Sequence, residues 1–327
     1  MSEAILGRHP AFFGKLPSRG DFVRSSGDAG LLAPLDRWLS RTMELLCENP
    51  RWKQRYDAQP GIDFAFLGAR SRLSIAGHLM PSRDASQRRF PFIAAIGIDN
   101  EDPLGFLSNA PRRLSETWAR LDHGVREAAR ATNATASLEA LTGQPVAVDT
   151  SAAGRSAIGD FLAGERCGEL ETRLSAAGQR VDLRRLVIAL GLLLQPLATT
   201  PAAVIGRGLD LPLPAEPALR DSVATLWLHL IGGFLRRTNI ELQILLAPVE
   251  GRSRMVIGFQ GASAPSLVSV FDPHAIEPHN IRIDDPQWVE ERIGADYGLA
   301  KLSSYLSQPA LPLERAVATF REVLLGE

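Results

Sequence analysis

The sequence has few cysteines, almost no net charge and no long run of apolar residues. Its two cysteines, Cys47 and Cys167, are not closely spaced, so neither a disulfide framework nor a zinc site is implied. The 36 basic and 37 acidic side chains leave a formal net charge of −1, which gives no reason to expect a nucleic-acid partner. The low cysteine content fits a reducing cytosol, and we expect a cytoplasmic location.

The strongest apolar run, LVIALGLLL at residues 186–194, is too short to cross a membrane, which takes about 20 residues. Arg184 and Arg185 precede this run, and Gln195 and Pro196 follow it, so a buried core helix is the better interpretation. The opening stretch MSEAILGRHP shows no charged segment followed by an apolar one, so we expect no secretory signal. We therefore predict no membrane insertion.

The motifs of several common enzymes are also missing. Neither the G-x-S-x-G turn of serine hydrolases nor the H-E-x-x-H helix of zinc proteases occurs, and the chain has no Asp-Gly dipeptide. The segment around Lys15 is not a phosphate-cradling loop. Gly7 lies too far from Gly14, and Leu16 stands where Ser or Thr would bind magnesium. We expect no enzymatic activity.

The nearest approach to a metal site is a short stretch that contains His274 and His279. Asp272 and Glu277 lie in the same stretch, but prolines make it irregular and a third well-spaced ligand is missing. We predict that the protein binds no metal and needs no cofactor.

Hydrophobic periodicity predicts a helix followed by strands in the first third of the chain. Apolar residues recur every three or four positions over 31–48, which indicates a helix that carries Trp38. Alternating apolar residues predict strands at 64–66 and 73–79, joined as an antiparallel hairpin. The nearly all-apolar run at 92–98 is typical of an interior strand covered on both faces.

The last third repeats this pattern, with an apolar helix at 223–234 and alternating runs at 240–246 and 255–259. We expect an α/β sandwich with a mixed, partly antiparallel sheet flanked by helices, plus a C-terminal α/β extension. The predicted units are an N-terminal domain at 1–135, a helical and Pro/Ala-rich connecting region at 136–219, and a C-terminal α/β region at 220–327.

One stretch, AFFGKLPSRGDFVR at residues 11–24, combines aromatic residues with residues that shape a loop. Gly14 and Gly20 can adopt backbone angles closed to other residues, and Pro17 fixes its own φ. We expect a defined loop, held by buried aromatic residues, that displays Lys15, Arg19 and Asp21.

Within this stretch, FGKLP at 13–17 and RGDF at 19–22 resemble the opening signature of the TagF/ImpM family, accessory proteins of bacterial type VI secretion. DRWL at 36–39 looks like the Asp-x-Trp-Leu helix of that family. MPSRD at 80–84 and RRFP at 88–91 are similar to its second hallmark. Several motifs therefore occur in the family's order within the first third of the chain.

The second hallmark departs from the family pattern at Gln87, where Gly is usual, so we expect a different backbone in that turn. The resemblance marks a set of family-motif and candidate partner-binding residues: Gly14, Lys15, Pro17, Arg19, Gly20, Asp21, Trp38, Pro81, Ser82, Arg83, Asp84, Arg88 and Arg89.

The resemblance implies a non-enzymatic, post-translational negative regulator of type VI secretion. Family members associate with the forkhead-associated (FHA) scaffold component of the apparatus, so that scaffold is the expected partner. Some members are fused to a metal-dependent phosphatase that holds its metals with Asp-Gly pairs. Because this chain has no such pair, the residues beyond the first domain are not expected to be that phosphatase.

Two other functions remain open at this point. One is a structural component of the secretion sheath or baseplate. The other is an enzyme or a binder of a small phosphorylated ligand, which would use the charged groups of the two hallmark loops: Lys15, Arg19, Asp21, Arg83, Asp84 and Arg88.

We also expect the loops at 13–21 and 80–91 to lie side by side and brace each other. Asp21 and Asp84 are predicted to be partly buried acids, with Lys15 more exposed. The cations available to them are Lys15, Arg19, Arg83, Arg88 and Arg89.

Overall fold

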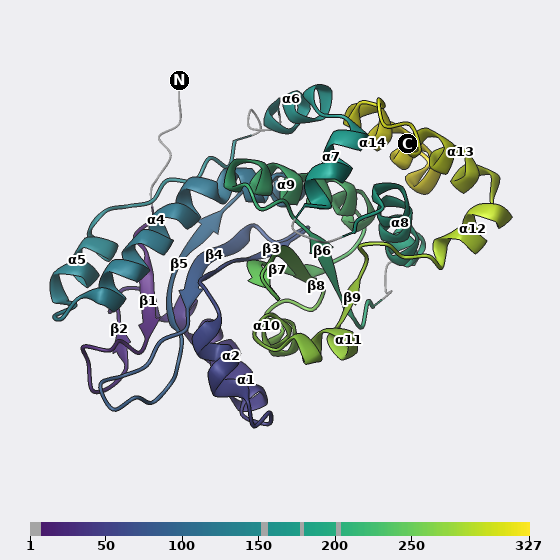
Figure 1. Cartoon of the computed structure of the whole chain (residues 1–327). Coiled ribbons are helices and arrows are strands. Elements are labelled where there is room, and N and C mark those ends of the chain that lie inside the picture. The colour runs from purple at the N-terminus through teal and green to yellow at the C-terminus, as the bar shows by residue number, and fades with distance from the viewer. Residues whose placement is uncertain (1–7, 152–155, 177–179, 201–203) are drawn as a thin grey trace, which may run out of the picture.

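A nine-stranded open sheet runs through the computed structural model, which describes residues 8–151, 156–176, 180–200 and 204–327. The strand order is β2-β1-β5-β4-β3-β7-β8-β6-β9, and helices cover both faces (Figure 1). Neighbouring strands are antiparallel except for the parallel pair β6 and β9. The predicted fold class, a mixed sheet flanked by helices, is confirmed.

The first five strands form one half of the sheet: β1 (Ala11–Gly14), β2 (Val23–Arg24), β3 (Ile62–Gly68), β4 (Leu73–Met80) and β5 (Phe92–Asp99). β3 and β4 make the predicted antiparallel hairpin, and β5 lies inside the sheet between β1 and β4. Its apolar run is explained by burial on both faces, because Ile93 packs into one hydrophobic cluster and Phe92 into another. The predictions of β3, β4 and β5 are confirmed, whereas β1 and β2 lie in the stretch at 11–24 that was predicted to be a loop.

The other half contains β6 (Gly208–Pro212), β7 (Glu241–Val249), β8 (Arg252–Gly258) and β9 (Asn280–Arg282). β7 and β8 form the predicted second hairpin. The two residues between them, Glu250 and Gly251, both have positive φ, 53° and 75°, as a tight two-residue hairpin turn requires. The sequence pattern missed the short strands β6 and β9, and β6 lies within the segment predicted to be a connecting region.

One face of the sheet is covered by α1 (Ala29–Leu46), α2 (Trp52–Ala58), α10 (Ala264–Phe271) and α11 (Ile276–His279), which lie together below the strands in Figure 1. A single turn of 3₁₀ helix at Pro273–Ala275 precedes α11. The helix predicted at 31–48 is α1, and its first turn is capped by Asp28, which accepts a hydrogen bond from the Leu31 N–H at 3.0 Å. The predicted helix is confirmed.

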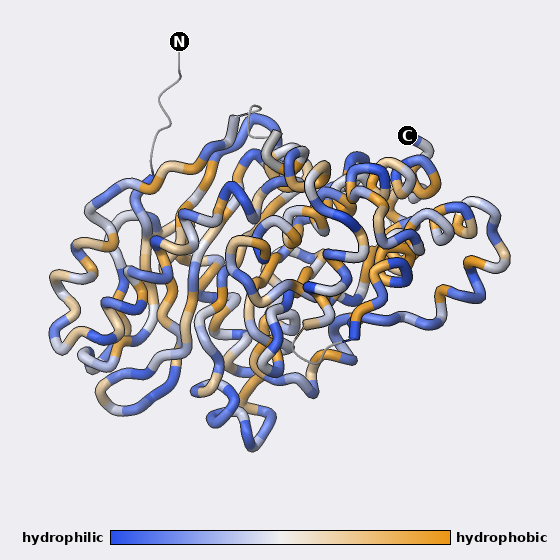
Figure 2. Tube along the Cα trace, turned by 45° about the horizontal axis from the view of Figure 1, so that its top comes forward, coloured by the Kyte–Doolittle hydropathy of each residue, from blue (hydrophilic) through white to orange (hydrophobic). Residues whose placement is uncertain are grey.

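The opposite face carries the larger hydrophobic core, and it includes the predicted core helix at 186–194 as part of α8 (Leu183–Thr199). Leu186, Leu190 and Leu194 on that helix are fully buried. Figure 2 shows the apolar stretches of the trace gathered in the interior and the hydrophilic stretches along the outer loops. No helix in the described residues is long and apolar enough to span a membrane.

The remaining helices are α3 (Pro103–Leu107), α4 (Ala110–Arg130), α5 (Thr135–Gly143), α6 (Ser156–Gly164), α7 (Cys167–Leu174), α8 (Leu183–Thr199), α9 (Pro217–Leu235), α12 (Val289–Ala295), α13 (Tyr297–Leu306) and α14 (Leu313–Leu325).

Trp38 on α1 connects the two halves of the molecule. Its side chain is only 3% exposed and packs on β3, with ring centroids 5.4 Å from Phe64 and 5.1 Å from Phe66. The indole N–H donates a hydrogen bond of 3.2 Å to the carbonyl of Ser263, just before α10. The expectation that Trp38 is buried against the sheet is confirmed.

We predict that Trp38→Ala lowers the free energy of unfolding by about 3–5 kcal/mol, because it leaves a cavity between α1 and β3. Chemical denaturation at equilibrium measures the change. Trp288→Ala is the matched control, since Trp288 is 45% exposed and its loss should change stability by less than about 0.5 kcal/mol. Equal effects of the two substitutions would contradict the role of Trp38.

Candidate functional site

The two motif loops, called here the first loop (residues 13–21) and the second loop (residues 80–91), lie side by side. β1 and β5 are antiparallel neighbours with Phe13 opposite Ile93, so the end of β1 meets the start of β5. Two hydrogen bonds to main-chain carbonyls join the loops: the Ala85 N–H donates to the Arg19 carbonyl at 2.8 Å, and the side-chain Nη2 of Arg88 donates to the Gly20 carbonyl at 2.8 Å. The predicted neighbourhood of the loops is confirmed.

Gly14 permits this close approach. It has φ of 133°, and a Cβ atom at this position would lie 2.0 Å from the carbonyl oxygen of Pro91. Any side chain would therefore push the first loop away from the second, which gives a steric reason for glycine here.

Asp84 is the centre of the contact between the loops. Its carboxylate is fully buried, with one oxygen 3.0 Å from Lys15 Nζ and 2.7 Å from Arg88 Nε. The other oxygen accepts hydrogen bonds of 2.9 Å from the main-chain N–H groups of Ser86 and Arg88. Burial would raise the pKa of Asp84, but the hydrogen bonds from Lys15 and Arg88 outweigh it and lower the pKa to about 2. The carboxylate is therefore ionised at neutral pH.

The expected roles of Lys15 and Asp21 are wrong. The Lys15 side chain is only 8% exposed, and its ammonium group lies 5.0 Å from the centroid of the Phe22 ring. Asp21 is exposed and accepts a hydrogen bond from the N–H of Phe22, its neighbour in the chain. Asp84, and not Asp21, is the buried carboxylate because the turn around Asp84 directs two main-chain N–H groups at it. Charge composition alone does not reveal this arrangement.

An aromatic cluster holds the first loop against the end of the second. Phe13 and Phe22 stack with centroids 5.3 Å apart. Phe90 packs edge-on against both rings, at 5.6 Å from Phe13 and 4.9 Å from Phe22. Phe13 and Phe90 are buried, as expected from the sequence, whereas Phe22 is 45% exposed.

Three motif residues attach the loops to neighbouring helices. Arg19 donates a hydrogen bond of 2.6 Å to Thr135 Oγ1 at the start of α5. Arg89 forms a bidentate pair with Asp57 of α2, with N···O distances of 2.8 and 2.6 Å, and this pair lowers the pKa of Asp57. The main-chain N–H of Ser82 donates to the hydroxyl of Tyr56 at 2.9 Å.

Tyr56, Asp57 and Thr135 were missed as parts of the site, because no sequence motif marks them. Of the other motif residues, Pro17 and Arg83 are exposed and Pro81 is half-buried.

Gln87 occupies a turn in which its N–H donates to the Asp84 carbonyl at 2.9 Å. Its φ is 65°, in the left-handed region that glycine adopts readily. Gln87 therefore takes a glycine-like conformation and bears the resulting strain, and a backbone different from that of the family stays a prediction.

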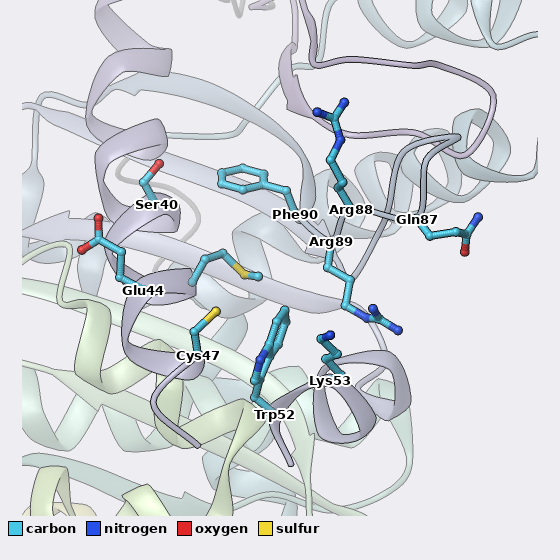
Figure 3. A pocket seen from close by; sticks show the side chains of 10 residues that line it. Ser40, Glu44, Cys47, Trp52, Lys53, Gln87, Arg88, Arg89 and Phe90 are labelled. Carbon is cyan, nitrogen blue, oxygen red and sulfur yellow. The ribbon is translucent and has the colours of Figure 1, made fainter. Parts of the chain in front are cut away.

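A groove of about 580 Å³ lies between α1, α2 and the second loop, and we call it the α1–α2 groove. Figure 3 shows the rings of Trp52 and Phe90 between the two helices and the loop, with Lys53 and Arg89 near each other at one side. The lining residues are Ser40, Met43, Glu44, Cys47, Trp52, Lys53, Gln87, Arg88, Arg89 and Phe90.

A second hollow, of about 340 Å³, lies beside the first part of the second loop. It is lined by Pro17, Asp57, Met80, Pro81, Ser82, Arg83, Arg126, Ala129 and Arg130. Asp57 lines this hollow and its partner Arg89 lines the α1–α2 groove, so their ion pair separates the two depressions.

His78 is the buried histidine that most resembles a catalytic group. Its Nδ1 lies 2.7 Å from a carboxylate oxygen of Asp63, and its Nε2 lies 2.9 Å from one of Asp122. Burial lowers the pKa of His78, but the two carboxylates reverse this effect and raise it above its usual value. Nδ1 is hydrogen-bonded to Asp63, whereas Nε2 lies close to the Asp122 carboxylate without a hydrogen bond of good geometry, and the cluster brings side chains of β3, β4 and α4 together.

Within the described residues, no group of three or more His, Cys, Asp and Glu side chains is arranged to hold a metal. In the stretch considered as a metal site, the Asp272 carboxylate instead pairs with Arg55 and accepts a hydrogen bond from Asn49.

Residues 11–143 match the model of a protein family described as "TagF N-terminal domain, Type VI secretion system-associated". This part of the chain is similar to a TagF N-terminal domain. The matched segment contains both motif loops, α1 to α5 and strands β1 to β5.

A search of solved structures found PA0076 from Pseudomonas aeruginosa PAO1, with 20% sequence identity and a TM-score of 0.38, covering 80% of this chain and 93% of that one. No curated protein matched the chain. The matched segment and the residues after it share one sheet, through the pairing of β3 with β7. The domain boundaries at 135 and 219 stay predictions.

We predict that Lys15→Met lowers the free energy of unfolding by about 1–3 kcal/mol, because the protein then buries Asp84 with one cation fewer. Lys53→Met is the matched control, since Lys53 is exposed. Its effect on stability, measured by denaturant unfolding, should stay within about 0.5 kcal/mol. A loss for Lys15→Met no larger than for the control would contradict the bracing role.

The low pKa of Asp84 predicts the pH dependence of this bracing. Its pKa falls from 3.8 to about 2 on folding, so the unfolded chain binds the proton more readily. The stabilisation is therefore complete above about pH 4 and lost as the pH falls towards 2. The stability difference between the unmodified protein and Asp84→Asn should shrink over that interval in acid-titrated unfolding experiments. A stability difference that does not change with pH would contradict the role of an ionised Asp84 at the centre of the contact between the loops.

We further predict that Gln87→Gly stabilises the protein by about 0.5–1 kcal/mol, because glycine adopts the left-handed conformation without the steric penalty that Gln87 bears. Thermal or denaturant unfolding measures the gain. Gln54→Gly in helix α2 is the matched control, and it should destabilise the protein by a similar amount. Loss of stability in both variants would show that the turn is not strained.

Proposed function

We propose that this protein is a non-enzymatic accessory protein of the type VI secretion system. In this proposal it holds secretion off after translation by binding a cytosolic component, with the FHA scaffold as the expected partner. The match to the TagF N-terminal domain supports the association with type VI secretion. The regulatory role, the scaffold partner and the cytoplasmic location belong to the proposal.

The observation that carries the proposal is that the charged motif residues contact one another. Lys15 and Arg88 both bind the buried Asp84, and this contact joins the two loops into one rigid element. A rigid loop pair that presents an irregular polar surface is suited to recognising a protein partner.

The same contacts disfavour a small phosphorylated ligand bound by these groups. Such a ligand would have to draw Lys15 and Arg88 away from Asp84 and leave a buried carboxylate without its partners. Arg19 is held by Thr135 in addition. The function as an enzyme or a phosphate binder at the motif loops is therefore less well supported than protein recognition.

Capture from the native cell tests the proposal, with two exposed arginines as a matched pair. Arg83 lies on the second loop and Arg292 on α12. Tagged protein should retain the FHA scaffold, and Arg83→Glu should reduce the retained amount about tenfold, as expected for a residue at an interface centre. Arg292→Glu should retain the scaffold fully, and secretion should rise only in the Arg83→Glu cells.

Equal capture by both variants, or capture of sheath or baseplate proteins in place of the scaffold, would contradict the proposal. Thermal unfolding of each variant checks that neither substitution acts by unfolding the chain.

A further inference from the structure

The α1–α2 groove has an apolar floor held in a fixed position. Met43 and Phe90 are each only 8% exposed, and Trp52 is half-buried. Trp52 packs edge-on against Tyr56 at 6.0 Å, and Tyr56 is fixed by its hydrogen bonds to Ser82. Preformed clefts of this size with a half-buried tryptophan in the wall are typical of binding sites that receive an apolar side chain.

The rim of the groove is predominantly cationic. Three of the lining residues are basic, Lys53, Arg88 and Arg89, and one is acidic, Glu44. The Glu44 carboxylate already pairs with Arg41 at 2.8 Å, so it does not offset the other charges.

Carboxylates within the protein neutralise this rim only in part. Arg89 is matched by Asp57, but Arg88 shares the single carboxylate of Asp84 with Lys15. In the described part of the chain no ion pair forms at Lys53, which is exposed on α2. A positive charge therefore remains beside an apolar floor.

We infer that the α1–α2 groove binds an acidic peptide segment of a protein partner, with one aromatic or aliphatic side chain placed between Trp52 and Phe90. The apolar floor favours the anchor residue, and the basic side chains, which lie together on one side of the groove, favour acidic residues next to that anchor. This inference rests on the proposed function as a protein-binding accessory factor. It adds two points to that function: a binding groove that lies outside the contact between the two loops, and the chemistry of the peptide segment that occupies this groove.

The two cysteines of the chain provide a direct reporter of this groove. Cys47 is exposed and lines it, whereas Cys167 is buried, and burial raises the pKa of the Cys167 thiol to about 11. A chromogenic aryl disulfide at neutral pH should therefore react with Cys47 alone. Any peptide that occupies the groove should slow that reaction.

Selection of random displayed dodecapeptides on the purified full chain tests the inference. The enriched peptides should combine net negative charge with an aromatic or large aliphatic residue. A synthetic peptide from this set should slow the reaction of Cys47 about tenfold at saturation, and its binding should weaken as salt increases. Trp52→Ala and Lys53→Glu should each reduce its affinity about tenfold.

Matched substitutions outside the groove are the controls. Trp288→Ala and Arg292→Glu replace a tryptophan and a cation on exposed parts of the chain outside the groove, and they should leave the affinity unchanged. Enrichment of neutral or basic peptides, no enrichment, or unchanged reactivity of Cys47 would overturn the inference.

The inference and the proposed function fail separately. If the FHA scaffold is captured from the cell but no acidic peptide binds in the groove, only the inference is overturned. Acidic peptides that protect Cys47 while the FHA scaffold is not captured overturn the proposed function and leave the groove assignment standing.

Discussion

The pairing of β3 with β7 is the interaction on which the rest of the structure depends. It runs in antiparallel register from Asp63 opposite Leu246 to Gly68 opposite Glu241. Without it, each half of the sheet would end in a long apolar edge strand, which is prone to pair with other chains. Side chains reinforce the pairing from both faces. Trp38 reaches from α1 to Ser263, and the indole of Trp118 on α4 donates to the Phe64 carbonyl at 3.0 Å.

Both ends of the sheet use the same polar arrangement, a fully buried aspartate between two cations from different segments. At one end Asp84 joins Lys15 and Arg88. At the other end Asp210 of β6 lies 2.6 Å from Arg254 of β8 and 2.8 Å from Arg282 of β9. Breaking such a pair leaves a buried charge, so these contacts specify which segments meet even where net stabilisation is modest. This explains how the short strand β9 is held with few main-chain bonds.

The sequence predicted the features that depend on local pattern. The hairpins, the interior strand β5 and the helix around Trp38 follow from periodicity and turn residues over short distances. β6 was missed because its sequence, GLDLP, is short and ends in proline, and its pairing with β8 is set by distant parts of the chain.

In the candidate site, too, some features could be predicted from the sequence and others depend on the folded structure. The closeness of the two loops was predictable from their mixed charges, but the choice of Asp84 over Asp21 depends on two main-chain N–H groups that only the folded turn directs. The attachment of Arg89 to Asp57 joins residues on a loop and a helix, and no motif connects them.

The shortness of the outermost strands limits the ways in which another protein can attach. β2 has two residues and β9 has three, so neither offers the continuous row of free main-chain groups that strand addition needs. A binding partner must therefore recognise side chains and loop surfaces. Selectivity then depends on shape and charge at a few positions, and single substitutions on the surface can retune it without disturbing the sheet.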